Sequence, residues 1–287
     1  MTASEISVVI PTWRRPGSLR QALDKILACD PPPAEVLVHI DVGDSETAPM
    51  LEREFAGRVT SFQTATTQGP GGGRNLLLQR AKSSLAASFD DDSWPLDADY
   101  FATAARLMDA NPRAGVLTGR VTLRGETPTA QPNAVSAVAS FEGCACVYRR
   151  EAFLATRGFL PLRHAYGMEE VDVALQLMNA GGDILRASSL RVYHDSELQH
   201  HVSPEINAAH ITNTALLAYL RYPIRYGPLG ALEVLNRMRY SLKMGRHRGI
   251  LKGLLTIPFT VWKYRALREP VKVETLRRSR QLAKKNT

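Results

Sequence analysis

The sequence predicts an α/β fold in which helices flank a mostly parallel central sheet, followed by a helical carboxyl-terminal extension. Up to Phe89, short apolar runs alternate with amphipathic helical patterns, which is typical of βαβ units. The apolar fraction of 44% and the charged fraction of 22% are those of a globular protein and exclude general disorder. From about Pro204 the pattern turns helical and basic. We therefore expect a main domain over residues 1–205 and an extension over residues 206–287.

Four strands are expected in the first part of the chain, at Ile6–Ile10, Glu35–Ile40, Val59–Phe62 and Leu85–Phe89. Helices separate them at Pro16–Cys29 and Thr47–Phe55, and a third helix follows a glycine loop at Gly69–Gly73. Further along, we expect helices at Ala98–Ala110 and Glu169–Ala180, and strands at Gly115–Leu123, Ile184–Leu185 and Leu190–Tyr193. The apolar segment Val135–Arg149 is interpreted as a strand pair or one bent strand.

The net charge of +8 is unevenly distributed along the chain. Residues 1–220 hold 19 Lys and Arg against 25 Asp and Glu, whereas residues 221–287 hold 17 against 3. Because the basic surplus lies entirely in the last quarter, a nucleic-acid partner is not expected. In that quarter, basic residues alternate with Leu, Ile, Trp and Tyr. This pattern indicates amphipathic helices on an anionic membrane surface, or alternatively a helical cap whose charges are solvated.

The cysteines and the hydrophobic runs bear on the cellular compartment. Cys29, Cys144 and Cys146 are too few for a disulfide scaffold, and no second pair completes a zinc site. The first residues lack the basic start of a signal peptide, and no apolar run is long enough to span a membrane. These features predict a cytoplasmic protein that attaches peripherally to the inner face of the cell membrane through its extension.

An acidic triplet is the strongest candidate for chemistry. Asp90, Asp91 and Asp92 follow the strand Leu85–Phe89, at the edge where open α/β sheets place their ligands. Adjacent carboxylates suit Mg²⁺ or Mn²⁺, which bridge to substrate phosphates. The alternative is a solvated turn that caps the next helix. An imidazole from His194, which closes a later strand, could complete the coordination shell.

Two further strand ends carry candidate binding residues. The glycines of Gln68–Asn75 let the backbone approach a bound anion or heterocycle, and Arg74 adds a planar positive charge. Trp13, within Pro11–Arg15, could stack a base, and Asp41 could accept hydrogen bonds from a base or ribose. Each segment also has a purely structural interpretation, as an ordinary turn or a helix cap.

A second acidic group opens the predicted helix Glu169–Ala180. Acids in a first helical turn are favoured by the helix dipole, so capping alone would explain them. The functional interpretation makes Glu169 or Glu170 a general base that removes a proton from an attacking hydroxyl. Asp172 lies three residues from Glu169 on the same helix face, where it could hold a neighbouring polar group.

In their order along the chain, these motifs resemble those of the family 2 glycosyltransferases. The family patterns are SVVIPTYNRP, an N-x-G-x-x-x-A-R-N helix start, DxD, RREAFLEVGGF, EDVDL and V-x-H. Their counterparts here are SVVIPTWRRP (Ser7–Pro16), QGPGGGRN (Gln68–Asn75), FDDD (Phe89–Asp92), YRREAF (Tyr148–Phe153), EEVD (Glu169–Asp172) and VYH (Val192–His194). The chain departs from the family at Ile40–Ser45, where the second acid of VDDGS is missing. Trp13 replaces Tyr, Arg14 replaces Asn, and Glu170 stands where the family usually has Asp.

The resemblance implies a GT-A fold and transfer of a sugar from a nucleotide-diphosphate donor to an acceptor hydroxyl, with inversion at the anomeric carbon. It implies donor contacts from Pro11, Thr12, Trp13, Arg15, Asp41, Arg74, Asp90 and Asp91. It implies that Asp92, Asp90 and His194 hold Mg²⁺ or Mn²⁺. Glu170 would be the base and Glu169 its neighbour, although the assignment between the two stays open.

On the acceptor side, the expected residues are Gly143, Tyr166 and Asp172. The acceptor itself is expected to be a saccharide, a cell-envelope polysaccharide or a lipid-linked glycan. Two alternatives remain at this level. A nucleotidyltransferase would need a glycine-rich, Arg-containing loop after the first strand, which Pro11–Gly17 does not supply. A non-catalytic binder of nucleotide sugars or nucleic acid would not need acids at several strand ends.

Overall fold

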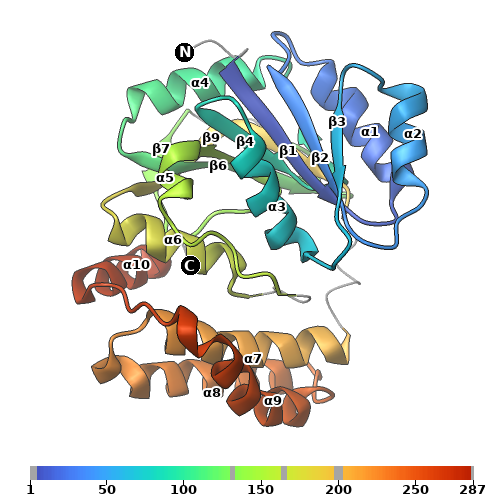
Figure 1. Ribbon diagram of the computed structural model, residues 1–287. Helices are drawn as coiled ribbons and strands as arrows, with labels where there is room; N and C mark the ends of the chain where they lie inside the picture. Colours follow the sequence, from blue (N-terminus) through green and yellow to red (C-terminus); the bar gives the residue numbers. More distant parts are fainter. Residues whose placement is uncertain (1–4, 130–132, 163–166, 197–202, 286–287) are drawn as a thin grey trace.

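The computed structural model describes residues 5–129, 133–162, 167–196 and 203–285. Within these residues, nine strands form one sheet in the order β3-β2-β1-β4-β8-β6-β9-β5, with β7 paired to β9. Helices cover both faces of this sheet, and a separate layer of helices lies beneath it (Figure 1). The predicted α/β architecture with a helical extension is confirmed.

One half of the sheet is parallel and brings the predicted site segments to a common edge. Its strands are β3 (Thr60–Gln63), β2 (Glu35–Ile40), β1 (Ile6–Thr12) and β4 (Leu85–Phe89). Three of them read as near-continuous apolar runs because they are buried on both faces. Since parallel strands end at the same edge, the segments after Thr12, Ile40 and Phe89 meet there.

The other half of the sheet is mixed, so the expectation of a mostly parallel sheet holds only for the first four strands. β8 (Ala145–Arg149) runs antiparallel to both β4 and β6 (Ala114–Leu123). β9 (Asp183–His194) is parallel to β6, and β5 (Ser93–Pro95) is antiparallel to β9. The β5–β9 register pairs Ser93 with His194, which carries the histidine to the acidic triplet.

Two strand predictions need correction. The two short strands expected at Ile184–Leu185 and Leu190–Tyr193 are one continuous strand, β9, whose pairing with β6 shifts register between Thr118 and Arg120. Such a bulge breaks the alternation of side chains that sequence patterns reveal. The segment Val135–Arg149 contains two strands, β7 (Val135–Ala137) and β8, but they do not pair with each other: β7 pairs with β9, and β8 pairs with β4 and β6.

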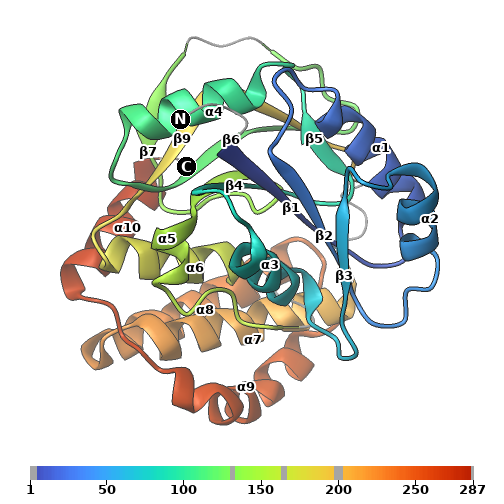
Figure 2. The same ribbon diagram turned by 45° about the horizontal axis from the view of Figure 1, so that its top comes forward.

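The helices divide between the two faces. One hydrophobic core is formed with α1 (Pro16–Leu27), α2 (Thr47–Glu54) and α4 (Tyr100–Ala110). The core on the opposite face of the sheet is formed with α3 (Gly69–Arg80), α5 (Arg150–Leu154) and α6 (Glu169–Asn179). Figure 2 shows this separation of α1, α2 and α4 from α3, α5 and α6.

The glycine run expected as a loop is the first turn of α3. Pro70 suits an early helical position because it has no N–H to donate. Asp41 accepts hydrogen bonds from the backbone N–H groups of Gln68 and Gly69, at 3.1 Å and 2.9 Å. A side chain at Gly73 would place its Cβ 2.6 Å from His39 Nδ1, so only glycine lets α3 approach the sheet this closely.

Over residues 203–285 the extension contains four α-helices: α7 (Pro204–Arg221), α8 (Gly227–Lys243), α9 (Ile250–Tyr264) and α10 (Val273–Lys285). Short 3₁₀ turns at Ile224–Tyr226 and Arg265–Leu267 connect them. α7 packs beneath α6 through a third hydrophobic core, and α10 returns to α6 (Figure 1). No helix in the described ranges is both long and apolar enough to cross a membrane. The division at residues 205 and 206 stays a prediction, and α7 begins at Pro204.

A buried ion pair fastens the extension to the main domain. The guanidinium of Arg221, on α7, donates to both carboxylate oxygens of Asp172, on α6, and each residue is only 1% exposed. Gln176 Nε2 donates to the same carboxylate at 3.1 Å. Because both charges are out of water, each depends on the other for its compensation.

We therefore expect Arg221→Ala to destabilise the fold by about 3–5 kcal/mol, since it leaves the Asp172 carboxylate buried and uncompensated. Urea unfolding measures this loss. Arg113→Ala is the matched control, because Arg113 pairs with Asp183 but its side chain is 74% exposed. The control should cost no more than about 1 kcal/mol. Equal losses in the two variants would contradict the special weight given to the buried pair.

Candidate active site

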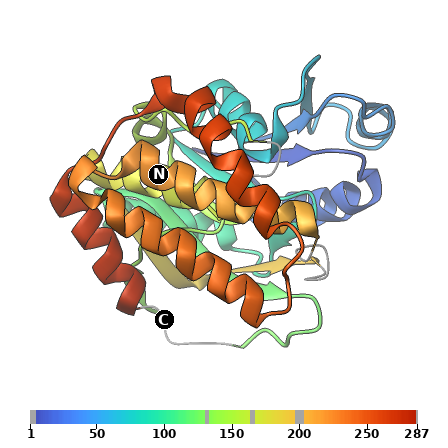
Figure 3. The ribbon, with the colours of Figure 1, turned by 90° about the horizontal axis from the view of Figure 1, so that it is seen from below.

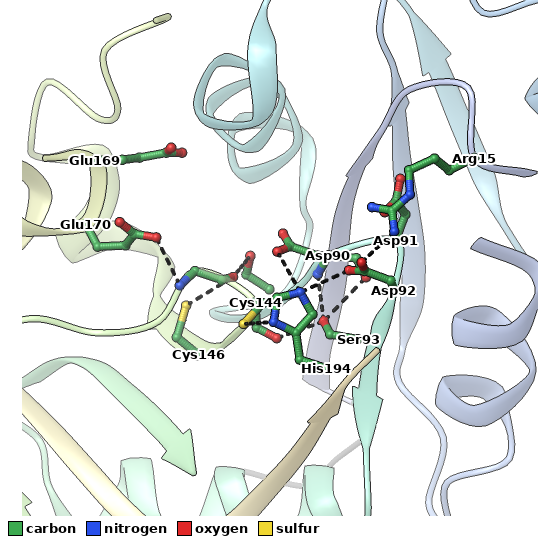
Figure 4. Close-up of polar contacts among 12 residues, drawn as sticks. Arg15, Asp90, Asp91, Asp92, Ser93, Cys144, Cys146, Glu169, Glu170 and His194 are labelled. Atoms are coloured by element: carbon green, nitrogen blue, oxygen red, sulfur yellow. Dashed lines mark hydrogen bonds and ion pairs between the residues drawn. The ribbon is translucent and has the colours of Figure 1, made fainter. Parts of the chain in front are cut away.

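Asp90, Asp91 and Asp92 follow β4 and point in different directions, each held by its own partners (Figure 4). The turn is fixed by Ser93, whose Oγ accepts from the backbone N–H of Asp90 at 2.8 Å and donates to the carbonyl of Cys144 at 2.9 Å. The middle acid turns back toward β1. Thr12 Oγ1 and Arg15 each donate to the Asp91 carboxylate at 2.7 Å, and burial raises its pKa to about 7.

Asp90 and Asp92 each give one oxygen to an arginine and turn the other toward His194. Arg15 donates to Asp92 Oδ2 at 2.5 Å, while His194 Nε2 lies 3.1 Å from Asp92 Oδ1. Arg74 donates to Asp90 Oδ1, while His194 Nε2 lies 3.8 Å from Asp90 Oδ2. Burial alone would raise the pKa of Asp92, but the neighbouring His194 and Arg15 outweigh it and lower this pKa to about 2. Burial favours neutral His194, but the same carboxylates prevail and raise its pKa.

This cluster has the composition of a divalent-ion site. Among the described residues, Asp90, Cys144 and His194 offer ligand atoms within 4.8 Å of one another. Asp92 Oδ1 is buried without a well-aligned hydrogen bond, although the imidazole of His194 is close. Carboxylate and imidazole groups suit Mg²⁺ or Mn²⁺, and the predicted ligands Asp90, Asp92 and His194 all converge here. The residues therefore fit a divalent ion.

The second acidic group lies at the start of α6, facing the first (Figure 4). Burial, followed by repulsion from Glu170, raises the pKa of Glu169 to about 8. Burial also raises the pKa of Glu170, whose Oε1 lies 3.4 Å from the backbone N–H of Gly143. Two carboxyl groups whose pKa values are both raised are suited to taking up a proton near neutral pH.

Arg74 joins the two acidic groups. Its guanidinium is buried and donates to Asp90 on one side, lies 3.5 Å from Glu169 Oε1 on the other, and donates through Nε to Ser88 at 3.0 Å. A single guanidinium spans only a few ångströms, so the carboxylates after β4 and those on α6 border one site. Burial disfavours the charge of Arg74, but Asp90 and Glu169 overcome this and raise its pKa.

The expected donor-side residues line the same sheet edge. Trp13 is 52% exposed, its Nε1 donates to the carbonyl of Val42 at 3.0 Å, and the guanidinium of Arg14 lies 4.9 Å from its ring. Asp41 is committed to the start of α3, as described above. Pro11, near the end of β1, packs against Gly73 of α3, where an added Cβ would lie 3.1 Å from Pro11 Cβ. The ring of Trp13 thus remains accessible, whereas Asp41 and Pro11 shape the edge beside it.

On the acceptor side, the structure corrects one expectation. The carboxylate of Asp172 does not face the site, because it is buried against Arg221 and Gln176. Within the fold it holds the side chains of Arg221 and Gln176. Gly143 does border the site, because a Cβ there would lie 3.1 Å from Glu170 Oε1 and 3.4 Å from Arg74 Cζ. Tyr166 lies outside the described residues.

Sequence reasoning missed three residues of this site: Ser88, Ser93 and Cys144. Ser88 could have been noticed, because it is a polar residue within the apolar strand β4. Cys144 Sγ lies 3.7 Å from His194 Nδ1, on the side of the ring opposite the carboxylates, so it helps to orient the imidazole. Burial raises the pKa of this thiol well above its usual value.

The half-parallel sheet with an acid cluster at its carboxyl edge is shared with solved glycosyltransferases of the GT-A fold, so the chain has that fold. The chain resembles a mannosyltransferase from Pyrobaculum calidifontis, solved with GDP-Man and Mn²⁺, at 16% identity over 91% of this chain and 80% of that chain, with a TM-score of 0.60. It also resembles S. aureus TarS, solved with UDP-GlcNAc, at 18% identity over 83% and 72% of the two chains, with a TM-score of 0.61. GalNAc-T7, solved with UDP, GalNAc and Mn²⁺, is 13% identical over 90% and 57%, with a TM-score of 0.65.

The family model for glycosyl transferase family 2 matches residues 7–160, which is more than half of the chain. The chain therefore belongs to this family and is a glycosyltransferase. This result sets aside the nucleotidyltransferase and the non-catalytic binder as alternatives. No curated protein matches the chain.

The close packing of α3 against α6 yields a test of the site. A Cβ at Gly71 would lie 2.8 Å from Glu169 Oε1 and 2.9 Å from Phe159 Cβ, so Gly71→Ala must displace the Glu169 carboxylate or α3. We expect sugar transfer to fall by about a hundredfold, the effect of a misplacement of roughly 1 Å. The rate of donor turnover measures this.

Gly17→Ala is the matched control, since Gly17 also lies in the first turn of a helix and a Cβ there meets nothing within 4 Å. Its turnover should equal that of the unmodified enzyme. If Gly71→Ala also keeps full turnover with an unchanged melting temperature, the position of Glu169 is unimportant for the reaction.

Proposed function

We propose that this glycosyltransferase moves a sugar from a nucleotide-diphosphate donor to an acceptor hydroxyl by a metal-assisted, inverting displacement. The observation that carries the proposal is the placement of Arg74 between Asp90 and Glu169. It puts a candidate cation site and a candidate base on opposite sides of one small space. An in-line displacement needs these two functions on opposite faces of the sugar ring.

Three features support a nucleotide-sugar donor. The structural neighbours were solved with GDP-Man, with UDP-GlcNAc and with UDP and GalNAc. The exposed ring of Trp13 offers a stacking surface for a base at the edge of the sheet. Arg15 stands beside Asp91 and Asp92, where its charge would balance the negative charge of a diphosphate. Pro11, Thr12, Asp41 and Arg74 would complete the donor side.

Asp90, Asp92 and His194 would hold Mg²⁺ or Mn²⁺. When bound, the ion supplies positive charge at the diphosphate that departs as the leaving group. The chain itself prepares the site: Arg15 and Arg74 each bind one carboxylate oxygen, of Asp92 and Asp90, and the other oxygen of each faces His194. Cys144 and Ser93 fix the imidazole and the turn that carries the acids.

The proton of the acceptor hydroxyl would pass to a carboxylate at the start of α6. Glu170 is the proposed base, and the backbone N–H of Gly143 orients its Oε1. Glu169 is the proposed neighbour on the acceptor side, close to Arg74. With the proton on the carboxylate, the acceptor oxygen forms the new bond to the anomeric carbon as the bond to the diphosphate breaks, which inverts the configuration.

The acceptor proposed is a saccharide, a cell-envelope polysaccharide or a lipid-linked glycan. We further propose that the enzyme works at the cytoplasmic face of the cell membrane, attached peripherally through its extension. The basic surplus of residues 221–287 supports this location, because cations are attracted to anionic lipid headgroups.

Removal of one metal ligand tests the cation site. Asp92→Asn should abolish Mn²⁺-dependent binding of UDP or GDP, because the amide loses the charge that compensates a divalent ion. A thermal-shift panel of UDP, GDP and dTDP, with and without Mn²⁺, measures binding, and chelation of the metal should reproduce the loss. Asp24→Asn, which changes an exposed acid on α1, should bind normally. Unchanged Mn²⁺-dependent binding by Asp92→Asn would refute the metal role.

Replacement of the proposed base separates binding from catalysis. Glu170→Gln should retain donor binding but lose turnover, because an amide cannot accept the proton. A base must be deprotonated to act, and the pKa of Glu169 is raised to about 8 with that of Glu170 raised beside it. The transfer rate of the unmodified enzyme should therefore still rise with pH above the range in which an ordinary glutamate titrates, because the pKa of Glu170 is raised. Near-normal turnover by Glu170→Gln would move the role to Glu169, and loss of turnover in both Glu170→Gln and Glu169→Gln would indicate that the pair acts together.

A further inference from the structure

The outer face of α9 is apolar and exposed. Leu251, Leu255, Phe259 and Trp262 are 69%, 70%, 65% and 61% exposed. Their spacing of three or four residues places them in one row along the helix. On the opposite side, Gly253 is buried against α7, where a Cβ would lie 2.8 Å from the carbonyl of Ala208. α9 is therefore fastened to the protein along one side and presents large apolar side chains on the other.

A groove runs beside this row. α8 and α9 both pack on α7, and a cavity of about 610 Å³ lies between the three helices. Small and apolar side chains line it, including Ala215, Ala218, Val234, Met238, Leu254 and Ile257. Figure 3, seen from below, shows the three helices lying in front of the sheet, and Figure 1 shows them as the lowest layer. The volume and the apolar lining of the groove suit a hydrocarbon chain.

The segment of the chain that carries the row is basic and contains no acid. Residues 234–268 contain no Asp or Glu but include nine cations: Arg237, Arg239, Lys243, Arg246, Arg248, Lys252, Lys263, Arg265 and Arg268. Lys252 and Lys263 lie on α9 itself, and the guanidinium of Arg265 lies 4.3 Å from the ring of Trp262. Two copies of this face would repel each other, whereas an anionic surface complements it.

We propose that α9 lies in the boundary between headgroups and acyl chains of an anionic phospholipid leaflet, with one acyl chain in the groove between α8 and α9. The exposed row enters the leaflet and the cations contact its phosphates, as in interfacial amphipathic helices. The proposal rests on the proposed function for the location of the acceptor, and it deepens that function by naming the docking surface. Because α6 and α7 separate the site from α9, the leaflet would lie about 20 Å from Glu169 and Glu170, two helix layers away.

Vesicle binding tests the proposal with matched variants of the full chain. The unmodified protein should float with vesicles of phosphatidylcholine and phosphatidylglycerol and not with phosphatidylcholine alone. Leu255→Ser with Phe259→Ser should weaken binding at least about tenfold. Lys252→Gln with Lys263→Gln should weaken it about thirtyfold, since each cation contributes roughly fivefold. Leu154→Ser and the pair Lys25→Gln with Lys82→Gln, exposed on the main domain, should bind normally.

Trp262 provides a direct readout of insertion. Its fluorescence should be quenched by vesicles that carry brominated acyl chains, and Trp262→Phe should lose this quenching. Failure to float with anionic vesicles, or equal loss in the control variants, would overturn the proposal. Dimerisation that shields Trp262 in the absence of lipid would overturn it in favour of a second copy of the chain.

Failure of the proposed function gives a different pattern. The α9 variants should hydrolyse the nucleotide sugar in solution at the unmodified rate, because none of the changed residues belongs to the site. A protein that floats normally but turns over no nucleotide sugar would retain the docking surface and lose the proposed chemistry.

Discussion

The buried guanidinium of Arg74 is the constraint on which the rest of the site depends. A charge with almost no access to water is tolerated only if opposite charges surround it. Asp90 and Glu169, which are 79 residues apart in the chain, supply them from the turn after β4 and from the start of α6. The guanidinium thereby fixes the distance between the acids that face the candidate ion and the acids that face the acceptor. It also draws Asp90 Oδ1 away, so that Asp90 Oδ2 is the oxygen left toward His194.

The backbone around Arg74 is arranged to make this burial achievable. Glycines at the first turn of α3 let the helix approach β1, β2 and α6 more closely than side chains would allow. The hydroxyl of Ser88 accepts a hydrogen bond from Arg74 Nε and donates one to the carbonyl of Gly143. Since the backbone N–H of Gly143 lies against Glu170, one hydrogen-bonded path runs from Arg74 to the proposed base. The glycine run therefore allows α3 to pack closely enough to position Arg74, and it does not form a loop.

The parts of this arrangement that the sequence predicts are the local ones. Apolar runs ending in Ile10, Ile40 and Phe89 predicted the parallel strands, and their shared edge followed from topology. The meeting of His194 with the triplet depends on the register between β5 and β9, which no local pattern encodes. The partner of Asp172 lies 49 residues further along the chain, so its carboxylate looked available in the sequence and is buried in the fold. Cys144 gave no signal, because a buried thiol beside an imidazole and a packed core thiol have the same sequence appearance.

The extension also bears on how the acids of α6 are positioned. Arg221 grips the helix that begins with Glu169 and Glu170, and Met168, just before them, packs in the same core as Leu216 and Leu220 of α7. On its other side, α7 contacts α9 through Gly253. Because α7 contacts both α6, which carries the proposed base, and α9, which carries the proposed lipid-binding face, it fixes the distance between them. The distance between the leaflet and the carboxylates of Glu169 and Glu170 would then be set by the packing of these helices. An acceptor anchored in the leaflet would react only if its hydroxyl extends that far from the lipid surface.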